Sequence, residues 1–151
     1  AVEIARAVFT LGHRAFYENQ NYHVRVKGLA MMQTGAEALH VWGRGKYPQA
    51  ESWMRPLREL HSRWQSKVGT IRKLNDANVA DIIRIARYDE DLSFRVLATL
   101  QLGVVKFSTE KSGNLRKIAA AIQTLKNDPE PKVSEAASFA DAFTKEEYLR
   151  L

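Results

Sequence analysis

The sequence predicts an all-α protein, with a long-helix hairpin or bundle in its N-terminal half packed on two short helical hairpins in its C-terminal half. Three observations support this class. Long apolar patterns repeat every three or four residues, as on one face of a helix. The 8 Gly and 4 Pro are few and fall mostly between these patterns. No stretch alternates apolar and polar residues as a half-buried strand does.

The length and composition suit one helical domain. The chain has 151 residues, of which 45% are hydrophobic, enough to bury a sizeable core. We expect this domain to have two parts. Residues 1–75 form the long-helix part, and residues 76–151 form the helical-hairpin part.

The first two predicted helices cover residues 1–18 and 22–42. In the first helix, the apolar stripe is Ile4, Val8, Leu11 and Ala15, with Phe9 and Phe16 beside it. In the second helix, the stripe is Tyr22, Val26, Leu29, Met32, Ala36 and Leu39. The polar residues Glu18–Asn21 break or cap the first helix, and the Gly- and Pro-containing segment Gly43–Pro48 ends the second.

The longest predicted helix covers residues 48–74. Its apolar stripe is Trp53, Leu57, Leu60, Trp64, Val68 and Ile71. We therefore expect Trp53 and Trp64 to pack in the core, whereas Trp42 and Tyr47, beside the preceding turn, are freer. Pro56 lies inside the segment and either kinks the helix or marks its true start, because proline has no backbone N–H.

Shorter helices are predicted in the second half, at residues 78–88, 91–107, 113–127 and 131–143, with a short tail at 145–151. An offset of 39 residues aligns the two pairs of helices without a gap. The matched positions are Ile83 with Ile122, Ala86 with Leu125, Asp89 with Asp128, Phe94 with Val133, Leu97 with Ala136, Ala98 with Ala137, and Val104 with Phe143. Each Asp is placed to accept hydrogen bonds from free N–H groups at the following helix start.

The stretch LKNDPEPKVSEAASFA, residues 125–140, resembles a HEAT-type helical repeat, whose turn often reads Asp-Pro before an apolar residue and a small-residue helix. The resemblance covers residues 79–143. HEAT repeats often carry Arg early in the second helix, which Arg95 matches and Ser134 does not. The other interpretation is two ordinary amphipathic hairpins that look alike, since a solenoid usually needs about three units. The resemblance implies a surface for binding proteins or nucleic acid and implies no chemistry.

The net charge of +6 is concentrated in the first half of the chain. Residues 1–75 contain 12 Lys and Arg against 5 Asp and Glu, whereas residues 76–151 contain 11 against 12. A basic surface favours anionic partners such as nucleic acid, acidic protein surfaces or anionic lipid. The other interpretation is that the charge keeps the protein soluble.

No set of residues in the sequence amounts to an active site, so we expect neither enzymatic activity nor a cofactor. The absence of Cys excludes disulfides, thiolate zinc sites and a Cys nucleophile. Neither a G-x-S-x-G nor a Walker motif is present; the segment Gly43–Lys46 is a helix–helix turn or a loose phosphate loop. The candidate metal ligands are Glu37 and His40, an E-x-x-H pair of the kind that di-iron bundles use twice. Since this pair occurs once, a solvated Glu beside a boundary His is the other interpretation.

The membrane and processing signals are also limited. The sequence has no run of about 18 apolar residues, so we expect a soluble protein without a transmembrane segment. The chain begins at Ala1 rather than Met, which fits a processed or trimmed chain.

These features lead to one leading functional hypothesis and two alternatives. The leading hypothesis is a non-enzymatic protein–protein interaction module, an adaptor or a subunit of a larger assembly. The first alternative is a nucleic-acid-binding protein, since a basic face beside aromatic residues suits phosphates and stacked bases. Its candidate residues are Arg44, Lys46, Arg55, Arg58, Arg63, Lys67, Arg72 and Lys73. The second alternative is a metal- or cofactor-binding helical bundle around Glu37 and His40.

Overall fold

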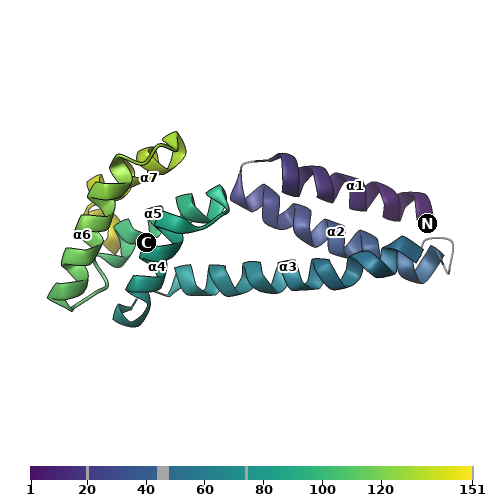
Figure 1. Ribbon diagram of the computed structural model, residues 1–151, viewed down its shortest axis with the longest axis horizontal. Coiled ribbons are helices and arrows are strands. Elements are labelled where there is room, and N and C mark those ends of the chain that lie inside the picture. The colour runs from purple at the N-terminus through teal and green to yellow at the C-terminus, as the bar shows by residue number, and fades with distance from the viewer. Residues whose placement is uncertain (20, 44–47, 74, 151) are drawn as a thin grey trace. The chain divides into compact units, whose positions relative to one another are not determined.

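The computed structural model describes residues 1–19, 21–43, 48–73 and 75–150 (Figure 1). These residues form eight α-helices and one short 3₁₀ helix and contain no strand, which confirms the all-α prediction. They divide into two compact units, Ala1–Ser66 and Lys67–Leu151, and the division falls inside the third helix. The prediction of a single domain stays a prediction, and each unit is described by itself.

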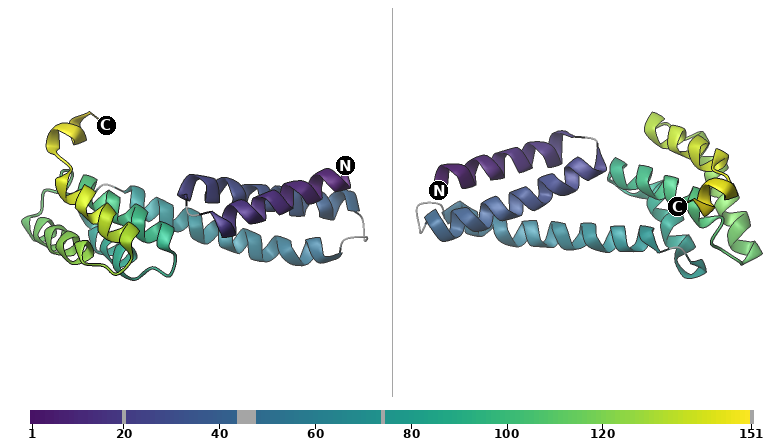
Figure 2. Two further views of the ribbon diagram at one scale, coloured as in Figure 1. Left: turned by 90° about the horizontal axis from the view of Figure 1, so that it is seen from above. Right: turned by 180° about the vertical axis from the view of Figure 1, so that it is seen from behind.

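The first unit contains α1 (Val2–Glu18), α2 (Tyr22–Gly43) and the larger part of α3 (Pro48–Arg72). Helices α1 and α2 form an antiparallel hairpin, seen from two sides in Figure 2. Asn21 caps the start of α2, because its Oδ1 accepts hydrogen bonds from the backbone N–H groups of His23 and Val24 at 3.0 and 3.3 Å. Pro56 lies inside α3, so the alternative that it marks the start of this helix is wrong.

Close backbone contact joins α1 to α2. A Cβ atom added at Gly12 would lie 2.6 Å from the carbonyl oxygen of Gly28, and one added at Gly28 would lie 2.7 Å from the carbonyl oxygen of Gly12. A Cβ added at Gly35 would lie 2.7 Å from the backbone nitrogen of Phe9. The two helices can approach this closely only because these positions carry no side chain.

This contact decides which face of α1 is buried, and it differs from the predicted stripe. The buried residues of α1 are Ala5, Gly12 and Phe16. Ile4 and Leu11, which were expected in the core, are 67% and 55% exposed. The prediction was based on the large aliphatic residues of the helix. In the structure, the small residues of α1 face α2 instead, because they let the two backbones touch.

Trp64 of α3 is the aromatic centre of the first unit and is 6% exposed. Its ring lies 5.0 Å from that of Phe16 and is nearly parallel to that of Tyr22, at 5.8 Å between centroids. The Arg25 guanidinium lies 5.0 Å from the centre of the Trp64 ring and also donates from Nε to the Phe16 carbonyl at 2.8 Å. The predicted role of Trp64 as a core residue is confirmed.

The second unit begins with the last turns of α3 and continues through the 3₁₀ helix η1 and five α-helices. Their bounds are η1 Asp76–Asn78, α4 Val79–Tyr88, α5 Leu92–Val105, α6 Ser112–Lys126, α7 Pro131–Ala142 and α8 Lys145–Leu149. Helices α4 and α5 form one hairpin, α6 and α7 form a second, and α5 packs along α7. The α5–α7 contact is close at Gly103, where a Cβ would lie 2.8 Å from the Cα of Ala140.

Buried positions of the two hairpins recur at the offset of 39 residues. The pairs in which both members are buried include Val79 with Ile118, Ile82 with Ala121, Ala86 with Leu125, Phe94 with Val133, and Ala98 with Ala137. The turns match as well, since the Oδ1 atoms of Asp89 and Asp128 each accept from the backbone N–H two residues later, both at 2.9 Å. The resemblance to HEAT repeats as a family stays a prediction.

Ion pairs connect these turns to the helix that precedes each hairpin. The Lys67 ammonium of α3 lies 2.9 Å from the Asp89 carboxylate, and the Arg95 guanidinium of α5 pairs with the Asp128 carboxylate. Burial by itself raises the pKa of Asp128, but the hydrogen bonds from Arg95 and the Glu130 backbone, with the Arg95 charge, lower that pKa below its ordinary value. Each turn is thereby held in place by a charged side chain from outside its own hairpin.

Candidate functional site

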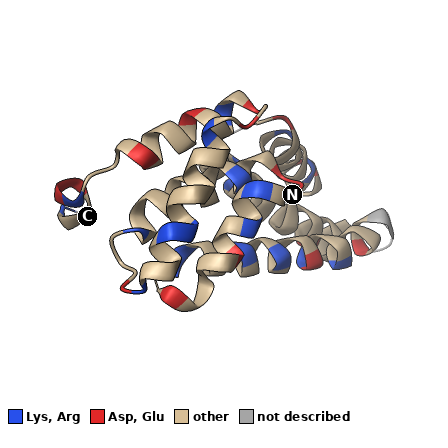
Figure 3. Cartoon of the chain, turned by 60° about the vertical axis from the view of Figure 1, so that its left-hand side comes forward, with Lys and Arg blue, Asp and Glu red and all other residues tan. Residues whose placement is uncertain are grey.

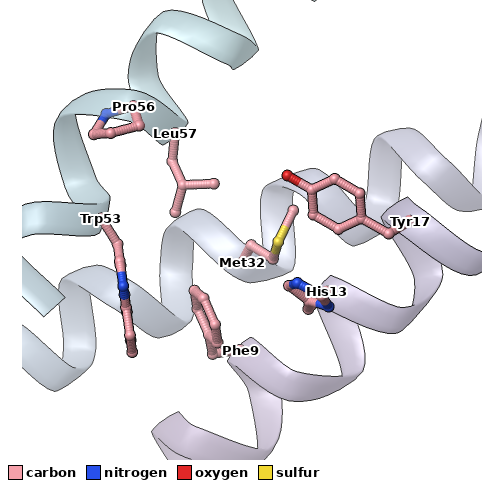
Figure 4. A pocket seen from close by; sticks show the side chains of 7 residues that line it. All are labelled: Phe9, His13, Tyr17, Met32, Trp53, Pro56 and Leu57. Carbon is pink, nitrogen blue, oxygen red and sulfur yellow. The ribbon is translucent and has the colours of Figure 1, made fainter. Parts of the chain in front are cut away.

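An open apolar groove of about 370 Å³ lies in the first unit between α1 and α3 (Figure 4). It is lined by Phe9, His13, Tyr17, Met32, Trp53, Pro56 and Leu57. Met32 and Leu57 are buried and form the floor, while Phe9 and Trp53 are half-buried and form the walls. His13, Tyr17 and Pro56 are exposed at the rim. The groove therefore presents aromatic surface to solvent above a closed core.

Helical spacing brings the α1 residues of the groove together. Phe9, His13 and Tyr17 recur every four residues, so they lie above one another on one face of α1. The Phe9 ring stacks on that of Trp53 at 4.6 Å, and the His13 and Tyr17 rings also lie 4.6 Å apart. These contacts form a continuous row of rings along one side of the groove.

The α3 side of the groove depends on Pro56. Proline has no N–H to donate to the helix ladder, and its ring is exposed beside Leu57 at the rim. Trp53 precedes Pro56 by three residues and Leu57 precedes Trp64 by seven, so the wall and floor continue into the core stripe of α3. The groove is thus continuous with the packed residues around Trp64.

One arginine on each groove helix lies about two helical turns from a residue of the groove rim. Arg6 precedes His13 by seven residues and Arg63 follows Pro56 by seven, and seven residues are close to two helical turns. Neither arginine makes an ion pair with any residue that the structure describes. The neighbouring carboxylate of Glu59 is already paired with Arg55 at 3.2 Å. Arg6 and Arg63 are thus unpaired cations on the two helices that form the groove.

The residues suggested as metal ligands lie at the surface of α2. Glu37 and His40 are both exposed on α2. Among the described parts of the chain, no three His, Asp or Glu side chains come close enough together to hold a metal ion. His13 is the histidine that lines the groove, and no carboxylate lines it with His13.

The predicted basic face is dispersed around α3. Arg44 and Lys46 lie outside the described residues. Arg55, Arg58, Arg63, Arg72 and Lys73 are exposed, as expected. However, Arg58 and Arg63 are five residues apart and so point in directions about 140° apart around the helix axis. Arg55 is paired with Glu59 and Lys67 with Asp89, and both signs of charge follow one another along the helices (Figure 3). The basic residues therefore do not form one continuous stripe.

Sequence reasoning missed the groove, although part of its signal was available. The aromatic and imidazole rings at positions 9, 13 and 17 have the spacing of one helix face. That spacing was hidden by the aliphatic stripe of Ile4 and Leu11, which has a similar period. The contribution of Met32, Trp53 and Pro56 depends on how three helices pack, which no local pattern shows.

Comparison of the chain with protein-family models, curated proteins and solved structures finds no match. Among the residues that the structure describes, no helix has both the length and the apolar character needed to cross a membrane.

Proposed function

We propose that this protein is a non-enzymatic protein-interaction module, and that the groove between α1 and α3 is where a partner docks. The observation that carries the proposal is an apolar groove of about 370 Å³ with aromatic walls, open to solvent. Small apolar clefts lined by aromatic rings suit the aromatic or aliphatic side chains that anchor many protein interfaces.

Exposure of the groove side chains supports a binding role. Tyr17 is 59% exposed and His13 is exposed, and neither donates a hydrogen bond to any described residue. Their O–H and N–H groups are therefore available to a ligand, above apolar surface that gains stability when covered. Rings with a polar tip and an apolar body are enriched at protein interfaces for this reason.

The alternative is a nucleic-acid-binding protein, and the exposed cations of α3 favour it. It ranks second because those cations are dispersed around the helix and partly neutralised by Glu59 and Asp89.

A peptide-display selection tests the proposal. The full chain is presented with a random library of 16-residue peptides, and the enriched peptides are tested against two variants of α1. Tyr17→Glu places a carboxylate at the groove rim, while Leu11→Glu places one at a matched exposure, 55% against 59%, outside the groove lining. We expect Tyr17→Glu to weaken peptide binding at least tenfold and Leu11→Glu to leave it within twofold.

Two results would overturn this assignment. A library that yields no enriched peptide argues against a peptide-binding module. Peptides that lose affinity with Leu11→Glu and keep it with Tyr17→Glu bind the exposed aliphatic stripe of α1 instead of the groove.

A salt titration with single-stranded and double-stranded nucleic acid separates the two functions. We expect weak binding that disappears near physiological salt, because contacts with phosphate release counterions and lose affinity as salt rises. Sub-micromolar binding at that salt, abolished by the double change Arg58→Glu and Arg63→Glu, would promote the alternative.

A further inference from the structure

We infer that the groove of the first unit takes an acidic peptide segment: an aromatic or aliphatic anchor with carboxylates on both sides of it. This inference rests on the proposed function and specifies the chemistry of the partner. It follows from the direction of the two groove helices, from the positions of the unpaired arginines and from the length of the groove.

The two helices that form the groove run in the same direction. Phe9 stacks on Trp53, and seven residues later Phe16 lies 5.0 Å from the ring of Trp64, eleven residues after Trp53. Arg6 therefore lies near the end of the groove where both helices begin. Arg63, next to Trp64, lies near the opposite end.

Each of the two groove helices thus carries, beyond the residues that line the groove, a cation without a partner among the described residues. The nearby carboxylate of Glu59 is paired with Arg55, so it does not neutralise Arg63. A ligand that places a carboxylate at each end gains a charge-assisted hydrogen bond with an arginine. A basic ligand meets like charge at both ends, which disfavours it.

The length of the groove sets the spacing of the acidic residues. From Arg6 to Tyr17, α1 advances eleven residues, or about 16 Å at the helical rise. An extended peptide covers that distance in about five residues. We therefore expect the acidic residues within about three positions of the anchor on either side, if the segment binds in an extended form, and about one and a half turns away if it is helical.

The test compares what three proteins select from the same random library of 16-residue peptides. The first is the parent chain. The second carries Arg6→Glu and Arg63→Glu, at the two ends of the groove. The third carries Arg14→Glu and Arg58→Glu, on the same two helices, with the same change in net charge. Arg58 follows Pro56 by two residues, about 200° around α3, so it points away from the groove. Arg14 follows His13 by one residue, about 100° around α1, and lies off the centre of the groove face.

We expect the parent and the Arg14/Arg58 variant to enrich anchors flanked by Asp and Glu, and the Arg6/Arg63 variant to enrich anchors flanked by Lys and Arg. In one selected peptide, changing its two flanking acids to amides should weaken binding to the parent roughly threefold to twentyfold, the range for two exposed ion pairs. The same amide peptide should bind the Arg6/Arg63 variant no worse than the acidic peptide does.

The outcomes separate this inference from the proposed function. Enriched anchors without acidic flanks, whose binding is lost with Tyr17→Glu, would overturn the acidic partner and leave the groove as a binding site. An equal loss of acidic preference in both double variants would assign the preference to the overall charge and overturn the role of Arg6 and Arg63. No enrichment on the parent would overturn both proposals.

Discussion

The two units of this protein bring helices together in different ways. In the first unit, α1 and α2 meet backbone to backbone at Gly12, Gly28 and Gly35, and aromatic rings fill the remaining space. In the second unit, aliphatic and alanine side chains pack between the hairpins beside a close backbone approach at Gly103, and ion pairs hold the turns. Both units leave some large side chains exposed, Tyr17 and Trp42 in the first and Tyr88 and Phe139 in the second.

The groove of the first unit is lined by large side chains that lie beside the contact between α1 and α2. When small residues occupy the helix contact, the bulky residues of the same helix project to its sides, as Phe9 and Tyr17 do from α1. In the second unit the large residues Phe94, Leu102 and Ile82 are themselves the contact and are 0% exposed. Apolar surface that is already buried between helices is not accessible to a partner.

In the second unit, the outer face of α7 is polar where the matching face of α5 is buried. At the offset of 39 residues, buried Thr99 and Leu102 of α5 correspond to Ser138 and Asp141 of α7, which are exposed. The face of α7 that would receive a third hairpin is therefore polar, as in the terminal units of helical arrays. Phe139 is the exception on this helix, at 60% exposed.

The three tryptophans allow the units to be followed separately. Trp42, Trp53 and Trp64 all belong to the first unit, so intrinsic fluorescence reports the unfolding of that unit alone. Far-UV circular dichroism reports the helices of both units. Each prediction below uses this separation, with urea as denaturant.

The largest effect is expected from Trp64→Ala. Truncating a buried aromatic side chain costs roughly 3–5 kcal/mol, a large share of the stability of a small unit. The fluorescence of the two remaining tryptophans should report the loss. Trp42→Ala, at a residue 55% exposed, is the control and should change little. Equal effects of the two changes would mean that the ring cluster around Trp64 does not hold the first unit together.

A comparable test of the backbone contact is Gly28→Ala. The added methyl group would lie 2.7 Å from the Gly12 carbonyl oxygen and from the Phe16 nitrogen, so α1 and α2 must separate. We expect a loss of roughly 1–3 kcal/mol in the unfolding monitored by fluorescence. Gly69→Ala is the control for the substitution itself, since nothing lies within 4 Å of its added Cβ. Because Gly69 belongs to the second unit, its expected stabilisation of roughly 0.5–1 kcal/mol is monitored by circular dichroism. A stabilising Gly28→Ala would contradict the close contact.

The turn ion pairs predict acid sensitivity in the second unit. The pKa of Asp128 is lowered in the folded protein, so its contribution is present above the unfolded value of about 3.9 and is lost as the pH falls through the folded value. Asp128→Asn leaves Arg95 partly buried without its anion and should cost roughly 1–3 kcal/mol at neutral pH, monitored by circular dichroism.

In the Asp128→Asn variant, the unfolding free energy should also fall less steeply as the pH drops below about 4. Part of the acid sensitivity should remain in this variant because of Asp76 and Asp141. Hydrogen bonds from Asn114 and from Lys126 lower the pKa values of these carboxyls too. An unchanged acid profile in Asp128→Asn would show that the pair with Arg95 does not contribute.

The smallest effect is expected from Ile4→Ser and Leu11→Ser. Both residues look like core positions in the sequence but are mostly exposed in α1, so each change should alter the unfolding free energy by less than about 0.5 kcal/mol. A loss of 2 kcal/mol or more, measured by fluorescence, would mean that the aliphatic stripe of α1 is buried and that the face assigned to the core is wrong.

The sequence by itself determined the helices and their ends. Periodic apolar residues, Asn21 before α2, Pro131 at the first position of α7 and Asp91 before α5 are local signals, and the seven longer helices begin and end within two residues of the predicted bounds. In the two hairpins of the second unit, the burial of Phe94, Ala98, Val133 and Ala137 was also predictable. The helices of these hairpins pack through the same residues that set their apolar pattern.

Only the tertiary structure decided which face of α1 is buried and where the groove lies. Two faces of that helix are apolar, one through Ile4 and Leu11 and the other through Phe9 and Phe16, and hydrophobicity alone does not choose between them. The choice is made by Gly12 and Gly28, whose missing side chains matter only when the two helices face each other. Contact between backbones is a property of a pair of helices, so a pattern within one helix does not contain it.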